Sequence, residues 1–98
     1  MRRDNLREYE FTVIFRPEDD AYKNGYENLK KLMEKYGFTS SRDEDMGVRD
    51  LAYPIKKTER GHYRYMEISA SPEKVADIDK ELKLVQDVLK FLFVRKES

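Results

Sequence analysis

The spacing of apolar residues in this 98-residue chain changes in a fixed order, and that order restricts the possible folds more than any other feature of the sequence. Apolar and polar side chains alternate over residues 9–15, which is typical of a half-buried strand. Apolar side chains then recur at helical spacing over residues 22–36. We expect Asp19 or Asp20 to cap this helix and Gly37 to end it.

Two further strands are predicted in the middle of the chain. Residues 38–55 are mostly polar, and their pattern predicts a second strand with a long, irregular outer portion. We expect this portion to be mobile at residues 39–45. Residues 62–70 alternate again and predict a third strand, with Met66 pointing to one side and Tyr63 to the other.

A second helix and a fourth strand complete the pattern. Ser71 stands where a helix cap is expected, and Pro72 stands where the first helical residue is expected. The apolar stripe of this helix consists of Val75, Ile78, Leu82 and Val85. Residues 88–94 predict the last strand, with Phe91 and Phe93 facing inward.

The order strand, helix, strand, strand, helix, strand is that of the split βαβ arrangement. We therefore predict an α+β, ferredoxin-like fold (βαββαβ), in which a four-stranded antiparallel sheet carries two helices on one face. The helices should cover seven side chains: Phe11, Val13, Phe15, Met66, Ile68, Phe91 and Phe93. The other face stays open and should carry Tyr63, Tyr65, Leu92 and Val94. His62 and Arg64 share the face of Met66, so we expect that face to reach solvent where the third strand begins.

Length and residue types narrow the possible functions. Ninety-eight residues suffice for one domain, and we assign residues 1–98 to it. The chain has no cysteine and a single histidine, which leaves little for a zinc site or for a nucleophile and its base. His62 thus lacks a partner for a catalytic pair. We expect no enzyme activity, no metal and no cofactor.

Charge is balanced over the whole chain but uneven along it. Twenty basic and twenty acidic residues cancel, so the chain as a whole has no long-range attraction for phosphates. RNA binding would have to come from local patches or from a basic partner. Basic residues gather in three places, which are Arg2, Arg3 and Arg7, then Lys56, Lys57 and Arg60, then Arg95 and Lys96. If both chain ends lie beside the central turn, these groups form one basic edge.

The apolar stretches of the chain are short. They fall far below the roughly 20 residues that a membrane-spanning helix needs. The amino end also lacks the apolar core of a secretory signal. The sequence therefore predicts a soluble, untargeted chain without a membrane partner.

One run of residues is the most informative about function. Leu51-Ala52-Tyr53-Pro54-Ile55-Lys56-Lys57 is entered from Gly47-Val48-Arg49 and is followed by Gly61-His62-Tyr63. Its proline has no N–H group to donate to the hydrogen bonds of a sheet, and two lysines follow. This pattern indicates an edge strand that leads into a basic turn. Positive charge then stands where a partner can reach it.

This run and its flanks resemble the signature of the bacterial ribosomal protein family called small-subunit protein six. In that family a Gly-x-Arg-x-Leu-Ala-Tyr-Pro-Ile segment precedes a basic turn and an aromatic strand. The resemblance extends from Tyr9-Glu10 through Tyr36-Gly37 to residues 88–94. It implies a structural protein on the platform of the small ribosomal subunit, which binds small-subunit rRNA together with small-subunit ribosomal protein eighteen. It also implies a cytoplasmic, ribosomal location and no small-molecule substrate.

Under this resemblance we assign two sets of contact residues. The expected RNA-binding residues are Arg7, Lys56, Lys57, Arg60, Arg95 and Lys96. The expected partner-binding residues are Tyr53, Tyr63, Tyr65 and Leu92. Phosphate contacts of this kind position the RNA rather than read its sequence. Arg7 matches a basic residue that shortly precedes Tyr-Glu in the family, whereas the residues before it look like an extension, so Arg2 and Arg3 receive no role.

The open aromatic face also admits other interpretations. An RNA-recognition module would stack bases on it, but the third strand lacks the run typical of that module. The tyrosines could instead only pack against residues 38–46. The alternative function is a homodimeric small-molecule-sensing domain of the same topology, which pairs sheets edge to edge. Acylphosphatase-like hydrolysis needs a phosphate-binding loop after the first strand, where Pro17 removes an amide beside Arg16.

Overall fold

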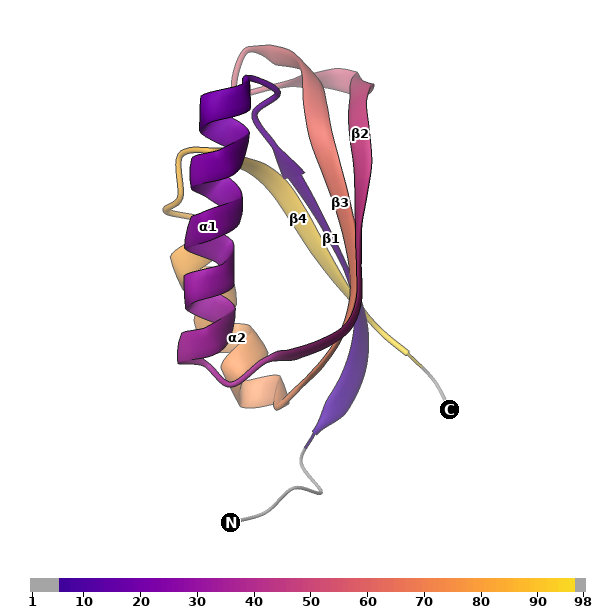
Figure 1. Cartoon of the computed structure of the whole chain (residues 1–98), viewed down its shortest axis with the longest axis vertical. Helices are drawn as coiled ribbons and strands as arrows, with labels where there is room; N and C mark the ends of the chain where they lie inside the picture. Colours follow the sequence, from indigo (N-terminus) through magenta and orange to yellow (C-terminus); the bar gives the residue numbers. More distant parts are fainter. Residues whose placement is uncertain (1–5, 97–98) are drawn as a thin grey trace.

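A computed structural model describes residues 6–96 and folds them into four strands and two helices (Figure 1). In chain order these are β1 (Arg7–Phe15), α1 (Asp19–Lys35), β2 (Thr39–Ile55), β3 (Thr58–Ala70), α2 (Pro72–Leu82) and β4 (Val88–Arg95). Neighbouring strands are antiparallel, in the order β2-β3-β1-β4. The predicted α+β, ferredoxin-like split βαβ arrangement is confirmed. Arg2 and Arg3 lie outside the described residues.

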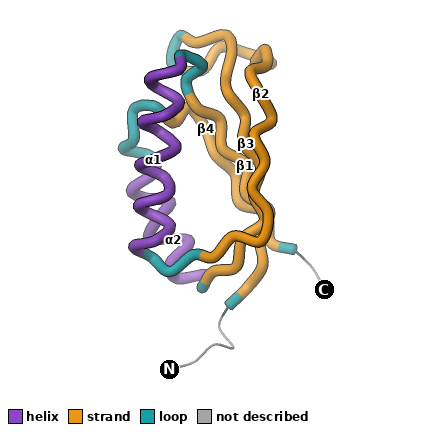
Figure 2. Tube along the Cα trace, viewed as in Figure 1, coloured by secondary structure: helices purple, strands orange, loops and turns teal. Residues whose placement is uncertain are grey.

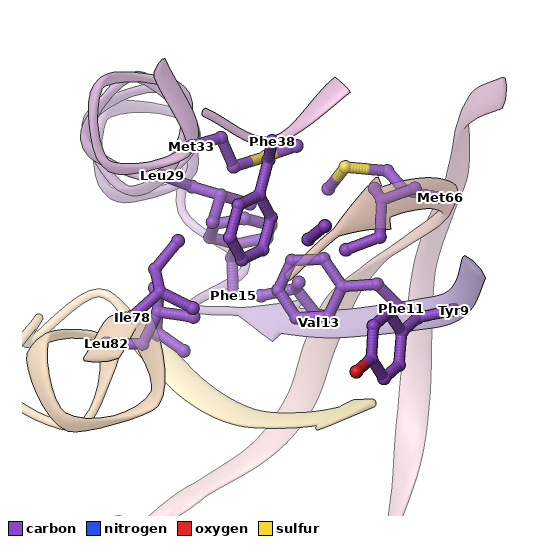
Figure 3. Close-up of a cluster of buried hydrophobic side chains, with 13 residues drawn as sticks. Tyr9, Phe11, Val13, Phe15, Leu29, Met33, Phe38, Met66, Ile78 and Leu82 are labelled. Carbon is purple, nitrogen blue, oxygen red and sulfur yellow. The ribbon is translucent and has the colours of Figure 1, made fainter. Parts of the chain in front are cut away.

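Both helices lie on the same face of the sheet (Figure 2). Alternate residues of β1 point toward them, because successive side chains of a strand point to opposite faces. Phe11, Val13 and Phe15 are completely buried there, as are Leu29 of α1 and Ile78 of α2 (Figure 3). This layer is the core. We call the helix-bearing side of the sheet the covered face and the other side the open face.

The two ends of α1 compare differently with the sequence prediction. The N-cap is Glu18, so the prediction that Asp19 or Asp20 caps the helix is wrong. Both aspartates lie in the first turn, where negative charge still favours the helix dipole. The prediction that Gly37 ends the helix is confirmed. Its φ is +75°, and the amides of residues 37 and 38 donate back into the last turn, as in a Schellman motif.

The covered face is largely shielded at His62 and Arg64, where the sequence predicts that it reaches solvent, and is well exposed only at Arg60, closer to the start of β3. The His62 ring stacks on the Tyr22 ring at a centroid distance of 3.6 Å. The Arg64 guanidinium lies 3.9 Å from the centre of the Tyr26 ring. The side chains of His62 and Arg64 are only 16% and 15% exposed. Two tyrosines one turn apart on α1 have enough apolar surface and polar tip to cover these side chains.

The β2–β3 hairpin is longer than the rest of the sheet. β2 and β3 have 17 and 13 residues, whereas β1 and β4 have 9 and 8. Residues 39–45, expected to be irregular and mobile, pair with β3 as a strand, and the irregularity takes the form of three register shifts along β2. The tip of the hairpin overhangs the end of the sheet and crosses it toward the start of β4 (Figure 1).

Candidate macromolecular interface

The register of the sheet fixes which side chains occupy the open face. Phe11 of β1 is buried against the helices, so Thr12, the next residue, faces away from them. Thr12 pairs with Tyr65 of β3 on one side and with Leu92 of β4 on the other. The same alternation places four side chains on this face, as the sequence predicts: Tyr63, Tyr65, Leu92 and Val94.

The tip of the hairpin brings Tyr53 to the same region. The Lys90 ammonium of β4 donates to the Tyr53 hydroxyl over an Nζ–O distance of 3.0 Å, and it lies 5.6 Å from the centre of the Tyr53 ring. The hairpin packs closely here because Gly61 has no side chain. A Cβ at Gly61 would lie 2.4 Å from Ile14 Cγ2 and 3.3 Å from Leu51 Cδ2. Tyr53 of β2, one edge strand of the sheet, thereby contacts Lys90 of β4, the other edge strand.

Exposure varies across the candidate partner-binding residues and their open-face neighbour Val94. Tyr53, Leu92 and Val94 are 57%, 59% and 46% exposed. Tyr63 and Tyr65 are half-buried. Apolar side chains grouped on one surface of a small domain are typical of a site that another macromolecule covers.

A polar network on the open face holds Tyr65. Its hydroxyl donates to Glu67 Oε2 at 3.0 Å. The Arg42 guanidinium lies 5.7 Å from the centre of the Tyr65 ring and pairs with the same carboxylate at 3.4 Å. Desolvation and the bond to Glu67 raise the pKa of Tyr65 to about 12. Since Arg42 belongs to residues 38–46, packing of a tyrosine against that segment does occur for Tyr65.

The candidate RNA-binding residues form two groups at opposite ends of the molecule. The hairpin group consists of Lys56, Lys57 and Arg60. The terminal group, where β1 begins and β4 ends, consists of Arg7, Arg95 and Lys96. Figure 1 shows these two places at opposite ends of the long axis, so the prediction of one basic edge is wrong. Antiparallel pairing explains this, because β1 ends and β4 starts at the end of the sheet where the hairpin turns.

The turn that carries the hairpin group has an unusual backbone. Lys56 and Lys57 have φ values of 50° and 65°, a region that two-residue hairpin turns usually fill with asparagine and glycine. The Lys56 ammonium donates to the Val88 carbonyl at 3.1 Å, so Lys56 also holds the hairpin against β4. Arg60 lies 3.3 Å from Asp50 in an exposed ion pair. The exposed Lys57 is thereby presented at the tip of the turn.

The terminal group is partly engaged in contacts within the chain. The Lys96 ammonium lies 3.2 Å from Glu67 Oε1, and the Lys96 amide donates to the Glu8 carbonyl at 2.8 Å. The Arg7 guanidinium donates to a neighbouring backbone carbonyl at 3.0 Å. Arg95 is exposed. The structure therefore places these three cations at one end of the sheet, away from the hairpin group.

Sequence reasoning did not anticipate a polar cluster between α1, β2 and β3. Its members are Tyr22, Tyr26, Asp43, Asp45, His62 and Arg64. Asp43 accepts from Arg64 Nε at 2.6 Å and from the Tyr26 hydroxyl at 2.6 Å. His62 Nε2 lies 2.6 Å from Asp45 Oδ1. The sequence did carry a signal for this cluster. Two tyrosines stand four residues apart in α1, acidic residues occupy alternate positions of β2, and basic residues occupy alternate positions of β3.

These contacts shift two pKa values in opposite directions. Burial, and the hydrogen bond that Tyr26 donates to Asp43, raise the pKa of Tyr26 to about 12. Burial would raise the pKa of Asp45, but hydrogen bonds from His62 and from the Gly47 amide outweigh it and lower this pKa. The charged form of Asp45 is therefore the one that the fold favours, and it ties β2 to β3 and α1.

Other kinds of site find less support. Within residues 6–96, no group of three His, Cys, Asp or Glu residues is arranged to hold a metal ion. The helices of this part of the chain are not long and apolar enough to cross a membrane. The exposed aromatic, aliphatic and basic side chains of the open face and its two ends suit contacts with another macromolecule.

Comparison with known proteins agrees with this geometry. Residues 8–95 match the model of a family described as ribosomal protein S6. The small ribosomal subunit protein bS6 of Treponema denticola is 40% identical over 93 residues, which cover 95% of this chain and 100% of the relative. The crystal structure of 30S ribosomal protein S6 from Thermotoga maritima has a TM-score of 0.82 at 23% identity, covering 93% of this chain and 88% of that one.

The fold itself is not confined to proteins of that name. The solution structure of the C-terminal domain of the MgtC protein from Mycobacterium tuberculosis has a TM-score of 0.65 at 17% identity. It covers 99% of this chain and 95% of that one. The fold alone therefore does not specify a function.

Proposed function

This chain belongs to the ribosomal protein S6 family, and we propose that it binds the RNA of the small ribosomal subunit together with a partner protein. Members of this family are structural proteins of the ribosome rather than enzymes, and they are cytoplasmic. The partner expected from the family is small-subunit ribosomal protein eighteen. No small molecule or cofactor takes part in this proposed role.

The observation that carries the proposal is the open face. Leu92 and Tyr53 are more than half exposed there, although both are large and mainly apolar. A protein that covers them removes apolar surface from water, which contributes roughly 25 cal/mol for each Å². Tyrosine in particular suits an interface, because its ring is apolar and its hydroxyl can stay hydrogen-bonded.

The charge of the chain supports binding as a pair. Its net charge is zero, and two cations of the two basic groups, Arg60 and Lys96, already form ion pairs within the chain. Affinity for RNA depends on how many phosphates are neutralised. A basic partner docked on the open face would add the missing cations, so the pair should bind RNA much more tightly than the chain alone.

The two basic groups should contact separate segments of RNA. The molecule is 43 Å along its longest axis, and the groups lie near its two ends. This separation exceeds the Debye length of about 8 Å at physiological salt, so the groups act almost independently. Removing one group should leave the contribution of the other unchanged.

The partner surface can be tested with matched glutamate variants. Leu92→Glu places a charge on the open face, and Leu84→Glu places the same charge at a position that is 83% exposed and follows α2. We expect Leu92→Glu to weaken binding of the partner protein at least tenfold, measured by titration calorimetry, and Leu84→Glu to leave it unchanged. If both variants bind the partner protein equally tightly, the open face is not the surface that the partner contacts.

The RNA surface can be tested through the salt dependence of binding by the pair. Replacing Lys57 and Arg60 with alanine should lower the magnitude of the slope of log K against log salt by about 1 to 2, since each phosphate contact contributes roughly 0.7 to 0.9. Alanine at Lys23 and Lys31, exposed on α1, is the matched control and should leave the slope unchanged. An unchanged slope in the first variant would exclude the hairpin group.

Sedimentation separates this role from the homodimeric sensing domain. The proposed role predicts a one-to-one complex when the partner protein is added to the chain. A stable dimer of the chain that fails to bind the partner would favour the sensing domain instead.

A further inference from the structure

A groove runs along the outer side of β4, between that strand and α2. It consists of two adjoining hollows of about 300 and 600 Å³, both of which are lined by Asp79, Lys83 and Phe91. Val75 and Phe93 continue the apolar lining along the strand. These apolar side chains are only partly buried, so part of their surface stays accessible. We call this feature the β4 groove.

The strand beside the groove has a free edge. In the sheet that residues 6–96 form, β4 pairs with β1 alone and lies at one end of the strand order. An edge strand presents backbone N–H and C=O groups that can pair with another strand. At its first residue, the Val88 carbonyl already accepts a hydrogen bond from Lys56. From Lys90 to Arg95 the register with β1 is regular and the strand contains no proline.

The opposite edge of the sheet is less suited to strand addition. β2 contains Pro54, and its pairing with β3 shifts register at three places. Prolines and bulges of this kind interrupt the row of groups that a partner strand would need. Of the two edges, β4 therefore offers the more regular template.

The charges around the β4 groove indicate what kind of segment would fit. Four lysines line it: Lys56, Lys80, Lys83 and Lys90. Among the described residues of the lining, the carboxylate is Asp79, which pairs with Lys83 at 3.1 Å. An excess of positive charge favours an acidic partner. Phe91 and Phe93 are alternate residues, so their spacing matches alternate side chains of an extended chain, roughly 6.5 Å apart.

We propose that the β4 edge binds an extended segment of another protein, with apolar residues at alternate positions and acidic residues between them. The segment adds a fifth strand through backbone hydrogen bonds to β4. Its apolar side chains enter the β4 groove over Phe91 and Phe93. The carboxylates alternate with them and so point to the open face, where Lys90 lies, and the lysines of the covered side attract them at longer range. Nucleic acid would meet the lysines too, but it has no strand backbone to pair with the edge. The inference goes beyond the proposed function because it concerns the β4 edge and not the open-face tyrosines, although Lys56 and Leu92 belong to both surfaces.

The test uses the full chain and a nine-residue peptide in which valine alternates with glutamate. We expect the peptide to slow amide hydrogen exchange in β4 between residues 89 and 95 at least tenfold at saturation. The same peptide with lysine in place of glutamate should not bind. Two peptides with N-methyl groups on alternate amides supply the sharpest comparison. Methyl groups on the amides that face β4 should abolish binding, and methyl groups on the other amides should not.

Variants of the chain test the charge requirement. Lys80→Glu combined with Lys83→Glu should weaken the peptide at least tenfold, whereas Lys30→Glu combined with Lys31→Glu on α1 is the matched control and should not. Equal binding by both methylated peptides, protection outside β4, or no binding at millimolar peptide would overturn the proposal. Stronger protection of β4 by a ten-nucleotide RNA would overturn it in favour of nucleic acid. A dimer of the chain that protects β4 without peptide would overturn it in favour of a second copy.

Discussion

The two faces of the sheet consist of the same strands, yet they differ sharply in packing. On the covered face Phe11 is completely buried, and Phe93 of β4 stacks on it at a ring distance of 4.1 Å. One residue away from Phe93, Leu92 points to the open face and is 59% exposed. Residues that hold the fold together therefore alternate with residues available to a partner. Substitutions at adjacent positions should separate stability from binding.

The largest effect should come from the covered face. Phe11→Ala removes a fully buried ring and leaves a cavity, which should lower the free energy of unfolding by about 3 to 5 kcal/mol. Leu92→Ala on the open face should lower it by less than about 1 kcal/mol, because its side chain is mostly in water already. Urea denaturation followed by circular dichroism measures both. Similar losses for the two variants would mean that the faces do not differ as described.

A smaller effect should appear where Gly61 packs against Ile14 on the open face. The Cβ of Gly61→Ala would lie 2.4 Å from Ile14 Cγ2, so the variant should be destabilised by about 1 to 3 kcal/mol. Ile14→Ala removes the methyl group in question. In a double-mutant cycle, Gly61→Ala should therefore cost less when Ile14→Ala is also present. Purely additive losses would show that this contact is not the cause.

The hairpin turn should show a gain in stability of about 1 kcal/mol. Lys56→Asn combined with Lys57→Gly supplies residues that prefer positive φ at both positions of the turn, which should relieve backbone strain. The same change removes two cations from the hairpin group, so RNA binding by the pair should weaken and become less salt-dependent. A loss of stability would indicate that the bond from Lys56 to Val88 outweighs the strain.

The smallest effect concerns acid sensitivity on the covered side. The pKa of Asp45 is lowered in the folded chain, so above its ordinary value of 3.8 the full stabilisation is present. As the pH falls below 3.8, the unfolded chain takes up the proton first, and this stabilisation is lost until folded Asp45 is protonated too. In Asp45→Asn the free energy of unfolding should fall less steeply with falling pH. The difference from the original chain should be less than about 1 kcal/mol, because the Asp45 side chain is half exposed.

Urea denaturation between pH 5 and pH 2 measures that difference. Glu67 and Glu81 also have lowered pKa values, mainly through hydrogen bonds from tyrosines, and they should leave a residual slope in the variant. An Asp45→Asn chain that loses stability as steeply as the original would exclude the pair with His62 as a source of acid sensitivity.

Much of the fold could be predicted because it depends on short-range patterns. Alternation in β1, β3 and β4 gave the correct faces for Phe11, Met66 and Leu92, since a strand can turn its residues only two ways. The end of α1 at Gly37 followed from the conformation that glycine permits. That residues 1–98 form one domain stays a prediction, because residues 1–5 and 97–98 lie outside the described residues.

The errors arose where side chains from distant elements meet. Burial of His62 and Arg64 depends on tyrosines of α1 that reach them only in three dimensions. The expected single basic edge failed for a different reason. The predicted topology itself places the β2–β3 turn opposite the start of β1 and the end of β4, so Lys57 and Arg95 could not have been neighbours. The assigned RNA-binding and partner-binding residues stay predictions.

Hydroxyl-radical footprinting of the chain, alone and within assembled small ribosomal subunits, tests the docking role of the open face most directly. If the open face docks onto the ribosome, Leu92 and Tyr53 should be oxidised in the free chain and protected at least fivefold in the subunit, while Leu84 should change little. Equal oxidation of Leu92 and Tyr53 in both states would contradict this docking role.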